Sequence, residues 1–296
     1  MTRPFAALLA CALAVAPAGA SPAGASPAGG PDTAAARIAR ALLSARPLAD
    51  PPALRAGEGP AVGARVRRLL AGRLGPVVGY KAALTSHAAR ARLGARQPLL
   101  GFLLRGMLLA GPRAAIRLGA QPPLLVEADL LVRVGDAAID TARADTELAA
   151  ALDAVIAFVE VPALPYAPAV RLDAELLAAA NAGAWLGVTG PAVPLRGTPG
   201  ERLRRLGAVR VHARDAATGR ALGAAGAAAL MGHPIHVVRW LRDRLRAEGV
   251  RLRAGDLLSL GSLTPPVRAR AGLVYEARYE GLGPGGPVTV RVRFLP

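Results

Sequence analysis

The segment Pro122–Val134, with the sequence PPLLVEADLLVRV, carries two acidic residues inside an apolar run. Glu127 and Asp129 lie two residues apart, so on a β-strand both side chains point to the same face, roughly 7 Å from each other. Two like charges on a buried face are costly unless a proton or a cation relieves them. A hard divalent cation with oxygen ligands would relieve both carboxylates at once.

A third acidic residue, Glu160, lies inside a second apolar run, AVIAFVEVPAL. Three carboxylates completed by water suit the octahedral coordination of Mg²⁺ or Mn²⁺. We therefore expect Glu127, Asp129 and Glu160 to bind one such ion. The alternative is that Glu127 and Asp129 lie on a solvated strand face and Glu160 at a strand end.

Lysine usage singles out one further position. Of the 37 basic residues one is a lysine, Lys81, and all the others are arginines. If composition bias exchanged Lys for Arg wherever that was harmless, Lys81 remains where an always-charged guanidinium cannot work. The alternative is that this lysine escaped exchange by chance and is a solvated strand residue.

The histidines and the cysteine give weaker indications. His87, His212, His233 and His236 form no H-x-x-x-H pair, and no Ser/His/Asp arrangement stands out. His233 precedes Pro234 at a predicted helix start, which favours a capping or core role. The single Cys11 excludes a disulfide framework and a cysteine-based metal site.

The elements that must position these residues follow from apolar periodicity. Residues 33–75 predict two or three helices, broken at Pro47 and at Pro51-Pro52. Residues 76–296 predict short strands separated by Gly and Pro, interrupted by one strong helix over His233–Glu248. This pattern predicts an α+β fold in which 33–296 form a single domain with a helical lead and a β-rich core. The strands that concern the site are Val77–Leu84, Leu124–Val134, Ala154–Val161 and Leu257–Leu260.

Composition excludes several protein classes. With 53% hydrophobic and 19% charged residues among 296, the chain can bury a large core and is not of the disordered type. The net charge is +17, but the basic runs contain almost no aromatic residues, so we expect no nucleic-acid partner. No apolar run reaches the roughly 18 residues of a membrane span.

The N-terminus has the pattern of an export signal. Arg3 is followed by an apolar stretch, Phe5–Val15, and by the small-residue sequence Ala18-Gly19-Ala20. We expect residues 1–20 to be a cleaved signal peptide and residues 21–32 a Pro/Ala/Gly linker. The mature protein is then expected in the periplasm, without Cys11.

Several short motifs occur in the order found in a known family. The series resembles the 2-keto-4-pentenoate hydratase and 4-oxalocrotonate decarboxylase branch of the fumarylacetoacetate hydrolase superfamily, and it covers roughly residues 33–296. The motifs are Gly79-Tyr80-Lys81, Leu84-Thr85-Ser86, Val126-Glu127-Ala128-Asp129, His233-Pro234, Ala254-Gly255-Asp256 and Gly261-Ser262-Leu263-Thr264-Pro265-Pro266.

The resemblance implies a mixed β-sandwich or β-roll core with a helical N-terminal segment, and a divalent metal that chelates a 2-oxo acid. Glu127 and Glu160 match the first and last metal ligands of the family, and Asp129 replaces its second Glu. Lys81 matches the family's lysine, which stabilises an enol or transfers a proton. The resemblance further implies a homo-oligomer. The residues expected to hydrogen-bond the substrate or the loop around it are Asn181, Ser262 and Thr264.

We therefore expect a metal-dependent lyase-type enzyme, hydratase- or decarboxylase-like, acting on a small 2-oxo or 2-hydroxydienoate acid. Two alternatives remain open: a hydrolase of the C–C bond in an acylpyruvate, and an exported, non-catalytic binder of 2-oxo acids. Gly106 stands where the family carries an Asp, which favours the binder. The retained Lys81 favours an enzyme.

Overall fold

The computed structural model of the chain describes residues 30–296. The expected signal peptide and residues 21–29 of the expected linker lie outside the described residues. Two helices form the predicted lead, α1 (Pro31–Ser44) and α2 (Glu58–Leu74), and they pack against each other. Helix α1 begins at Pro31, inside the segment expected as linker, because proline is well suited to the first position of a helix.

The larger sheet of the described chain has eight strands and positions the acidic residues. Strand β5 lies between β10 and β6 and is antiparallel to both, while β1 runs parallel to β10 on its other side. In spatial order the strands are β2 (Leu99–Leu104), β1 (Val77–Ala83), β10 (Leu257–Ser262), β5 (Leu125–Val134), β6 (Leu152–Val161), β7 (Leu186–Pro194) and β3 (Leu108–Ala110), with β11 (Val267–Arg268) paired to β5.

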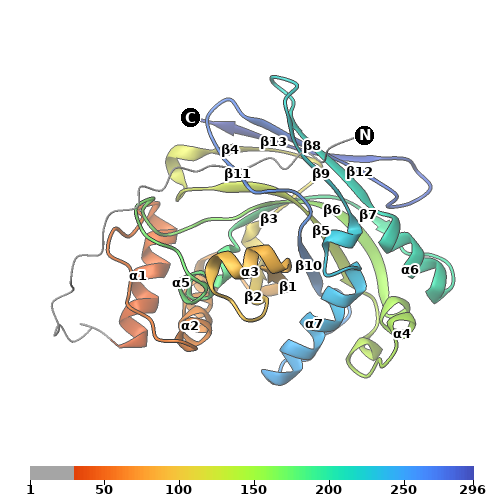
Figure 1. Ribbon diagram of the computed structural model, residues 1–296, viewed down its shortest axis with the longest axis horizontal. Coiled ribbons are helices and arrows are strands. Elements are labelled where there is room, and N and C mark those ends of the chain that lie inside the picture. Colours follow the sequence, from red (N-terminus) through yellow and green to blue (C-terminus); the bar gives the residue numbers. More distant parts are fainter. Residues whose placement is uncertain (1–29) are drawn as a thin grey trace, which may run out of the picture.

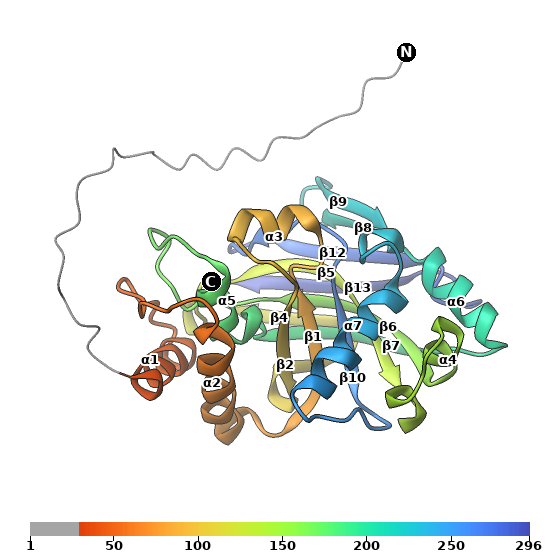
Figure 2. The same cartoon turned by 60° about the horizontal axis from the view of Figure 1, so that its bottom comes forward.

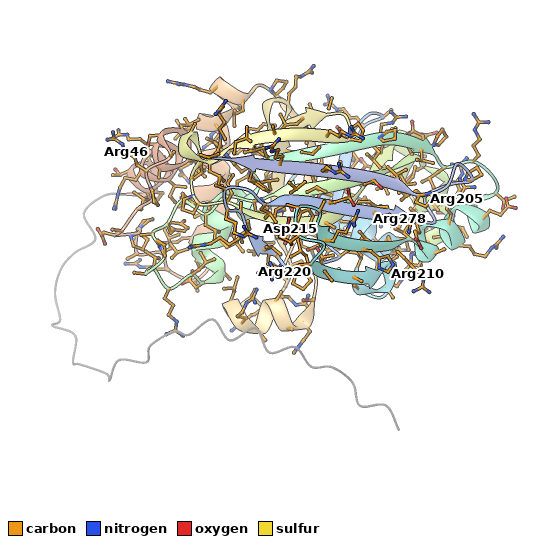
Figure 3. All side chains as sticks on the ribbon, turned by 90° about the horizontal axis from the view of Figure 1, so that it is seen from above. Arg46, Arg205, Arg210, Asp215, Arg220 and Arg278 are labelled. Atoms are coloured by element: carbon orange, nitrogen blue, oxygen red, sulfur yellow. The ribbon has the colours of Figure 1, made fainter. Side chains whose placement is uncertain are left out.

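A second sheet of five strands packs on the first, and Figure 1 shows it above the helices. Its inward side chains include Tyr275 and Tyr279, both fully buried, and the Tyr279 hydroxyl donates to the backbone carbonyl of Phe158 in β6. Arg210 and Arg278 lie on its outer face, seen in Figure 3. In spatial order the strands are β4 (Arg113–Arg117), β13 (Val288–Leu295), β12 (Val274–Glu280), β8 (Arg210–Asp215) and β9 (Ala221–Gly226).

The strong helix predicted near residue 233 is α7 (Pro234–Ala247), which packs on β10 and β1. The Nδ1 atom of His233 accepts a hydrogen bond from the Ile235 N–H at 3.1 Å, so the predicted capping role is confirmed. Four shorter helices were not predicted, because six to ten residues give little periodicity. They are α3 (His87–Leu93), α4 (Asp145–Ala150), α5 (Ala174–Ala179) and α6 (Pro199–Ala208).

The architecture confirms the expected α+β class, with curled sheets and a helical N-terminal part. None of the helices in residues 30–296 is long and apolar enough to cross a membrane.

Candidate active site

Strand pairing brings the predicted residues together in the middle of the larger sheet. Glu127 of β5 lies directly opposite Glu160 of β6 in the antiparallel register. On the other side of β5, the partner of Asp129 is Ser262 of β10, and β10 in turn pairs with the strand that carries Lys81. Side chains directly opposite in such a pair are neighbours, so the two glutamates share one local environment.

A cavity of about 590 Å³ opens at this point of the sheet. Five of the seven predicted site residues line it, and Asp129 and Asn181 do not. The sheet therefore gathers most of the predicted site, although these residues come from segments almost 200 positions apart. The five are Lys81, Glu127, Glu160, Ser262 and Thr264.

Lys81 is buried, with 3% of its surface exposed, and its ammonium forms an ion pair with Glu160 Oε1. On the neighbouring strand it faces Gly101, where an added Cβ would lie 2.6 Å from the Lys81 Cγ. Glycine at position 101 thus leaves room for the lysine stem. Burial lowers the pKa of Lys81, but the carboxylates of Glu160 and Glu127 raise it by more, so its pKa lies above the usual value. The carboxylates thus keep Lys81 protonated and positively charged.

Lys81 pairs with Glu160, and the opposed Glu127 has no ion pair of its own among the described residues. Among the described residues, Glu160 Oε2 is the buried side-chain polar atom that has no hydrogen-bond partner. Burial, and then the nearby Glu160 carboxylate, raise the pKa of Glu127 to about 8. An unpartnered buried carboxylate oxygen beside a second carboxylate is the environment that a divalent cation would satisfy, so the donor set fits a metal.

Asp129, two positions after Glu127 on β5, does not line the cavity. Its Oδ2 accepts a hydrogen bond from Ser259 Oγ at 2.6 Å, and its Oδ1 accepts one from the Gly261 N–H at 3.0 Å. Burial, and then Glu160, raise its pKa to about 7. The positive φ of Gly261, +100°, creates the irregularity in β10 that directs this N–H towards Asp129.

The three predicted ligands therefore are not gathered into one complete set of metal ligands. Across residues 30–296, no group of three or more His, Cys, Asp or Glu side chains is gathered in the arrangement of a metal site. The physical reason is that Asp129 is one methylene shorter than glutamate and that both its oxygens are held by β10. Its role as a metal ligand stays a prediction, whereas Glu127 and Glu160 face the cavity.

Asn181 was expected to hydrogen-bond the substrate or the loop around it, and it does not line the cavity. Its amide Nδ2 donates to the Phe102 carbonyl and its Oδ1 accepts from the Phe102 N–H, both at 2.9 Å. The residue has a left-handed φ of +55°, which asparagine tolerates better than most residues. The side-chain oxygen and nitrogen of Asn181 therefore both bond to backbone groups rather than face the cavity. Asn181 braces the loop whose next residues, Ala182 and Gly183, line the cavity.

Ser262 and Thr264 line the cavity on the β10 side of Glu127. Thr264 Oγ1 accepts a hydrogen bond from the Ala128 N–H at 3.0 Å and pairs with the Tyr275 hydroxyl at 2.9 Å. Ser262 Oγ donates to the Thr264 carbonyl. The Ser262 hydroxyl also offsets a small part of the rise in the pKa of Glu127. Thr264 thus fixes the wall to β5, and Ser262 lies beside the glutamate.

Sequence reasoning missed the residues that shape the loop after Lys81. Leu84 has a strained φ of +57°, and the Arg90 guanidinium donates to the Leu84 and Thr85 carbonyls at 3.1 and 2.9 Å. Leu84 and Thr85 line the cavity. Nothing in the sequence distinguishes Arg90 from the many other arginines. Leu84 and Thr85 belong to one of the family motifs, Leu84-Thr85-Ser86. Gly106 packs near Leu74 and does not line the cavity.

Comparisons with known proteins agree with this fold. The chain is 30% identical over 214 residues to 2-keto-4-pentenoate hydratase from Burkholderia vietnamiensis, covering 70% of this chain and 76% of that protein. It is 28% identical over 240 residues to 4-oxalocrotonate decarboxylase from Pseudomonas putida, covering 78% and 82%. No protein-family model matches the chain.

Two solved structures have the same architecture. The 4-oxalocrotonate decarboxylase from Pseudomonas putida G7, complexed with magnesium and adipate, superposes with a TM-score of 0.76 at 25% identity. That match covers 90% of this chain and 97% of the other. Fumarylpyruvate hydrolase from Pseudomonas aeruginosa, in complex with Mn²⁺ and pyruvate, has a TM-score of 0.51 at 14% identity over 73% and 88%, which supports the fold alone.

Fold and relatives together define a hydratase-like enzyme of the lyase class. The chain belongs to the family of 2-keto-4-pentenoate hydratase and 4-oxalocrotonate decarboxylase. The suspected resemblance is confirmed.

If the opposed glutamates bind a divalent cation, removing one charge without changing shape must weaken binding. We expect Glu127→Gln to lower the affinity for Mg²⁺ and Mn²⁺ at least tenfold in titration calorimetry, since a neutral amide is a poorer ligand for a hard cation. Asp50→Asn, at a carboxylate with 95% of its side chain exposed, is the matched control and should bind like the wild type. Unchanged affinity in Glu127→Gln would show that the ion binds elsewhere.

Proposed function

We propose that this enzyme is a metal-dependent lyase, hydratase- or decarboxylase-like, that acts on a small 2-oxo or 2-hydroxydienoate acid. The observation that carries the proposal is the unpartnered Glu160 Oε2, buried opposite Glu127 and next to Lys81 in one cavity. The names of the relatives, a hydratase and a decarboxylase, support the same reaction class.

The residues that would hold the cation are Glu127 and Glu160, with Asp129, two positions after Glu127 on β5, as the third candidate. Mg²⁺ and Mn²⁺ are the ions expected for such oxygen ligands, and the solved relatives contain magnesium, calcium and Mn²⁺. When bound, the ion would act as a Lewis acid on the 2-oxo group of the substrate. The carboxylates of this chain fix where that end of the substrate lies.

Lys81 supplies the proton chemistry in this proposal. Its ammonium is buried, faces the cavity and is held by Glu160, so it can hydrogen-bond the enol oxygen or give a proton to the substrate. Arginine could not replace it, because the guanidinium does not release its proton and is larger. The limited room beside Gly101 adds a steric reason. The Ser262 hydroxyl, beside Glu127, is one of the neutral groups on the cavity wall that can bind a substrate oxygen.

The substitution Lys81→Arg tests this role because it keeps the positive charge. We expect turnover to fall at least tenfold, about 1.4 kcal/mol of barrier, while folding and Mg²⁺ binding survive. The assay is a panel of 2-oxo acids and 2-hydroxydienoates with and without Mg²⁺. Arg73→Lys, at the end of α2, is the control for the exchange itself.

Turnover by Lys81→Arg at the wild-type rate would remove the catalytic assignment. If the wild-type protein binds 2-oxo acids but converts none of the panel, the result would instead support the alternative function, a non-catalytic binder of 2-oxo acids.

We also propose that the mature enzyme works in the periplasm, on the basis of Arg3, the apolar stretch Phe5–Val15 and Ala18-Gly19-Ala20. N-terminal mass spectrometry of the protein from its native host is expected to give a first residue near Ser21. Recovery of the chain with Met1 intact from the cytosolic fraction would contradict export.

A further inference from the structure

Two tyrosines of the second sheet reach the larger sheet from the same strand. Tyr275 and Tyr279 lie four positions apart on β12, so both side chains point to the same face, and both are fully buried. Figure 2 shows β12 close to β5, the strand that carries Glu127. The Tyr279 hydroxyl donates to the Phe158 carbonyl, whereas the Tyr275 hydroxyl contacts Thr264 Oγ1 at 2.9 Å. Thr264 lines the cavity and Tyr275 does not, so any effect of Tyr275 on a ligand passes through Thr264.

The donor in the contact between Tyr275 and Thr264 follows from the other partners of the two hydroxyl groups. Burial raises the pKa of Tyr275, so its phenol keeps its proton. Within residues 30–296, the side-chain partner of that hydroxyl is Thr264 Oγ1. A buried phenol proton without an acceptor is costly, so Tyr275 donates this hydrogen bond and Thr264 accepts it.

This assignment fills the acceptor sites of the Thr264 hydroxyl. Its Oγ1 also accepts the Ala128 N–H at 3.0 Å, and a hydroxyl oxygen has two lone pairs. With both lone pairs occupied, the Thr264 proton must point away from Ala128 and from Tyr275. No side chain or carbonyl of the described chain accepts that proton. Because Thr264 lines the cavity, a bound ligand can supply the acceptor.

The Thr264 side chain has little freedom to leave this position. It is β-branched, which restricts rotation about χ1. Its carbon atoms pack against Gly223 of β9, where an added Cβ would lie 3.2 Å from Thr264 Cβ. The Thr264 carbonyl accepts a hydrogen bond from Ser262 Oγ, which holds the backbone. The freedom that remains is rotation of the hydroxyl proton, and the hydrogen bond from Tyr275 removes it.

We infer that Tyr275 is a positioning residue whose phenol makes Thr264 a fixed hydrogen-bond donor to an oxygen of the bound ligand. The inference rests on the proposed function, which places a 2-oxo acid in this cavity. A donor that is already oriented loses no rotational freedom when the ligand binds. A hydrogen bond from it to a carboxylate or enolate oxygen is also charge-assisted, and therefore stronger than one between neutral groups.

The test removes the phenol oxygen and keeps the ring. Titration calorimetry of the full chain measures two affinities, one for Mg²⁺ alone and one for 2-oxobutanoate in the presence of Mg²⁺. We expect Tyr275→Phe to weaken 2-oxobutanoate binding about fivefold or more, because a hydrogen bond to a charged group loses its orientation. The Mg²⁺ affinity should stay within about twofold of the wild type, because Glu127 and Glu160 are unchanged.

Tyr279→Phe is the matched control. It removes the same hydroxyl group from the same face of β12, but that hydroxyl donates to the Phe158 carbonyl. This variant should lose a comparable thermal stability and bind 2-oxobutanoate like the wild type.

A second arm repeats Tyr275→Phe in the Thr264→Val background. The phenol has no hydroxyl to orient there, so its loss should change the affinity for 2-oxobutanoate by less than about twofold. If Thr264→Val does not fold, the comparison of Tyr275→Phe with Tyr279→Phe decides the question alone.

The outcomes distinguish the inference from the proposed function. Wild-type affinity for 2-oxobutanoate in Tyr275→Phe would overturn the inference and leave the proposed function in place. The same holds for an equal loss of affinity in the Thr264→Val background. A parallel fall in Mg²⁺ affinity would also overturn it, because Tyr275 would then be a structural support of β5. If the wild type shows no Mg²⁺-dependent binding of 2-oxobutanoate, both the proposed function and the inference are contradicted.

Discussion

Within the described chain, the carboxyl groups of Glu127 and Glu160 face each other across neighbouring strands, and Glu160 is paired with the ammonium of Lys81. Glu127 and Glu160 are fixed opposite each other by the register of β5 and β6, so neither can move away without breaking the ladder. Repulsion and desolvation raise the pKa of Glu127, and one oxygen of Glu160 is left without a partner. A cation resolves this conflict more completely than a proton, because it can contact both side chains.

The surrounding structure holds this unfavourable arrangement in place. Gly101 gives the Lys81 stem its space, and the N–H of Gly261 holds Asp129 behind the glutamates. Thr264 hydrogen-bonds the backbone of β5 and the Tyr275 hydroxyl of the second sheet. Gly101 and Gly261 sit on strands of the larger sheet, and Thr264 links that sheet to the second one, so the charged end of the cavity is held from several sides.

Sequence reasoning could predict the charged residues because each breaks an apolar strand pattern, and Lys81 because it is the single lysine among arginines. The fold class and the strands around the site were also predictable, since their apolar runs are long and are separated by Gly and Pro. The hydrogen bonds between Asp129 and β10 could not be predicted, because they depend on an irregularity near Gly261 that the sequence does not indicate. Asn181 was expected to hydrogen-bond the substrate or the loop around it, but its pairing with the Phe102 backbone could not be predicted, because it joins segments 79 residues apart.

The central claim is that Glu127 and Glu160 would together hold one divalent cation. Anomalous diffraction from crystals grown with Mn²⁺ tests it most directly, because the scattering locates the ion without reference to activity. The account predicts one strong peak within about 2.3 Å of a carboxylate oxygen of each glutamate, including Glu160 Oε2. A peak elsewhere, or no peak with the Lys81–Glu160 ion pair intact, would contradict it.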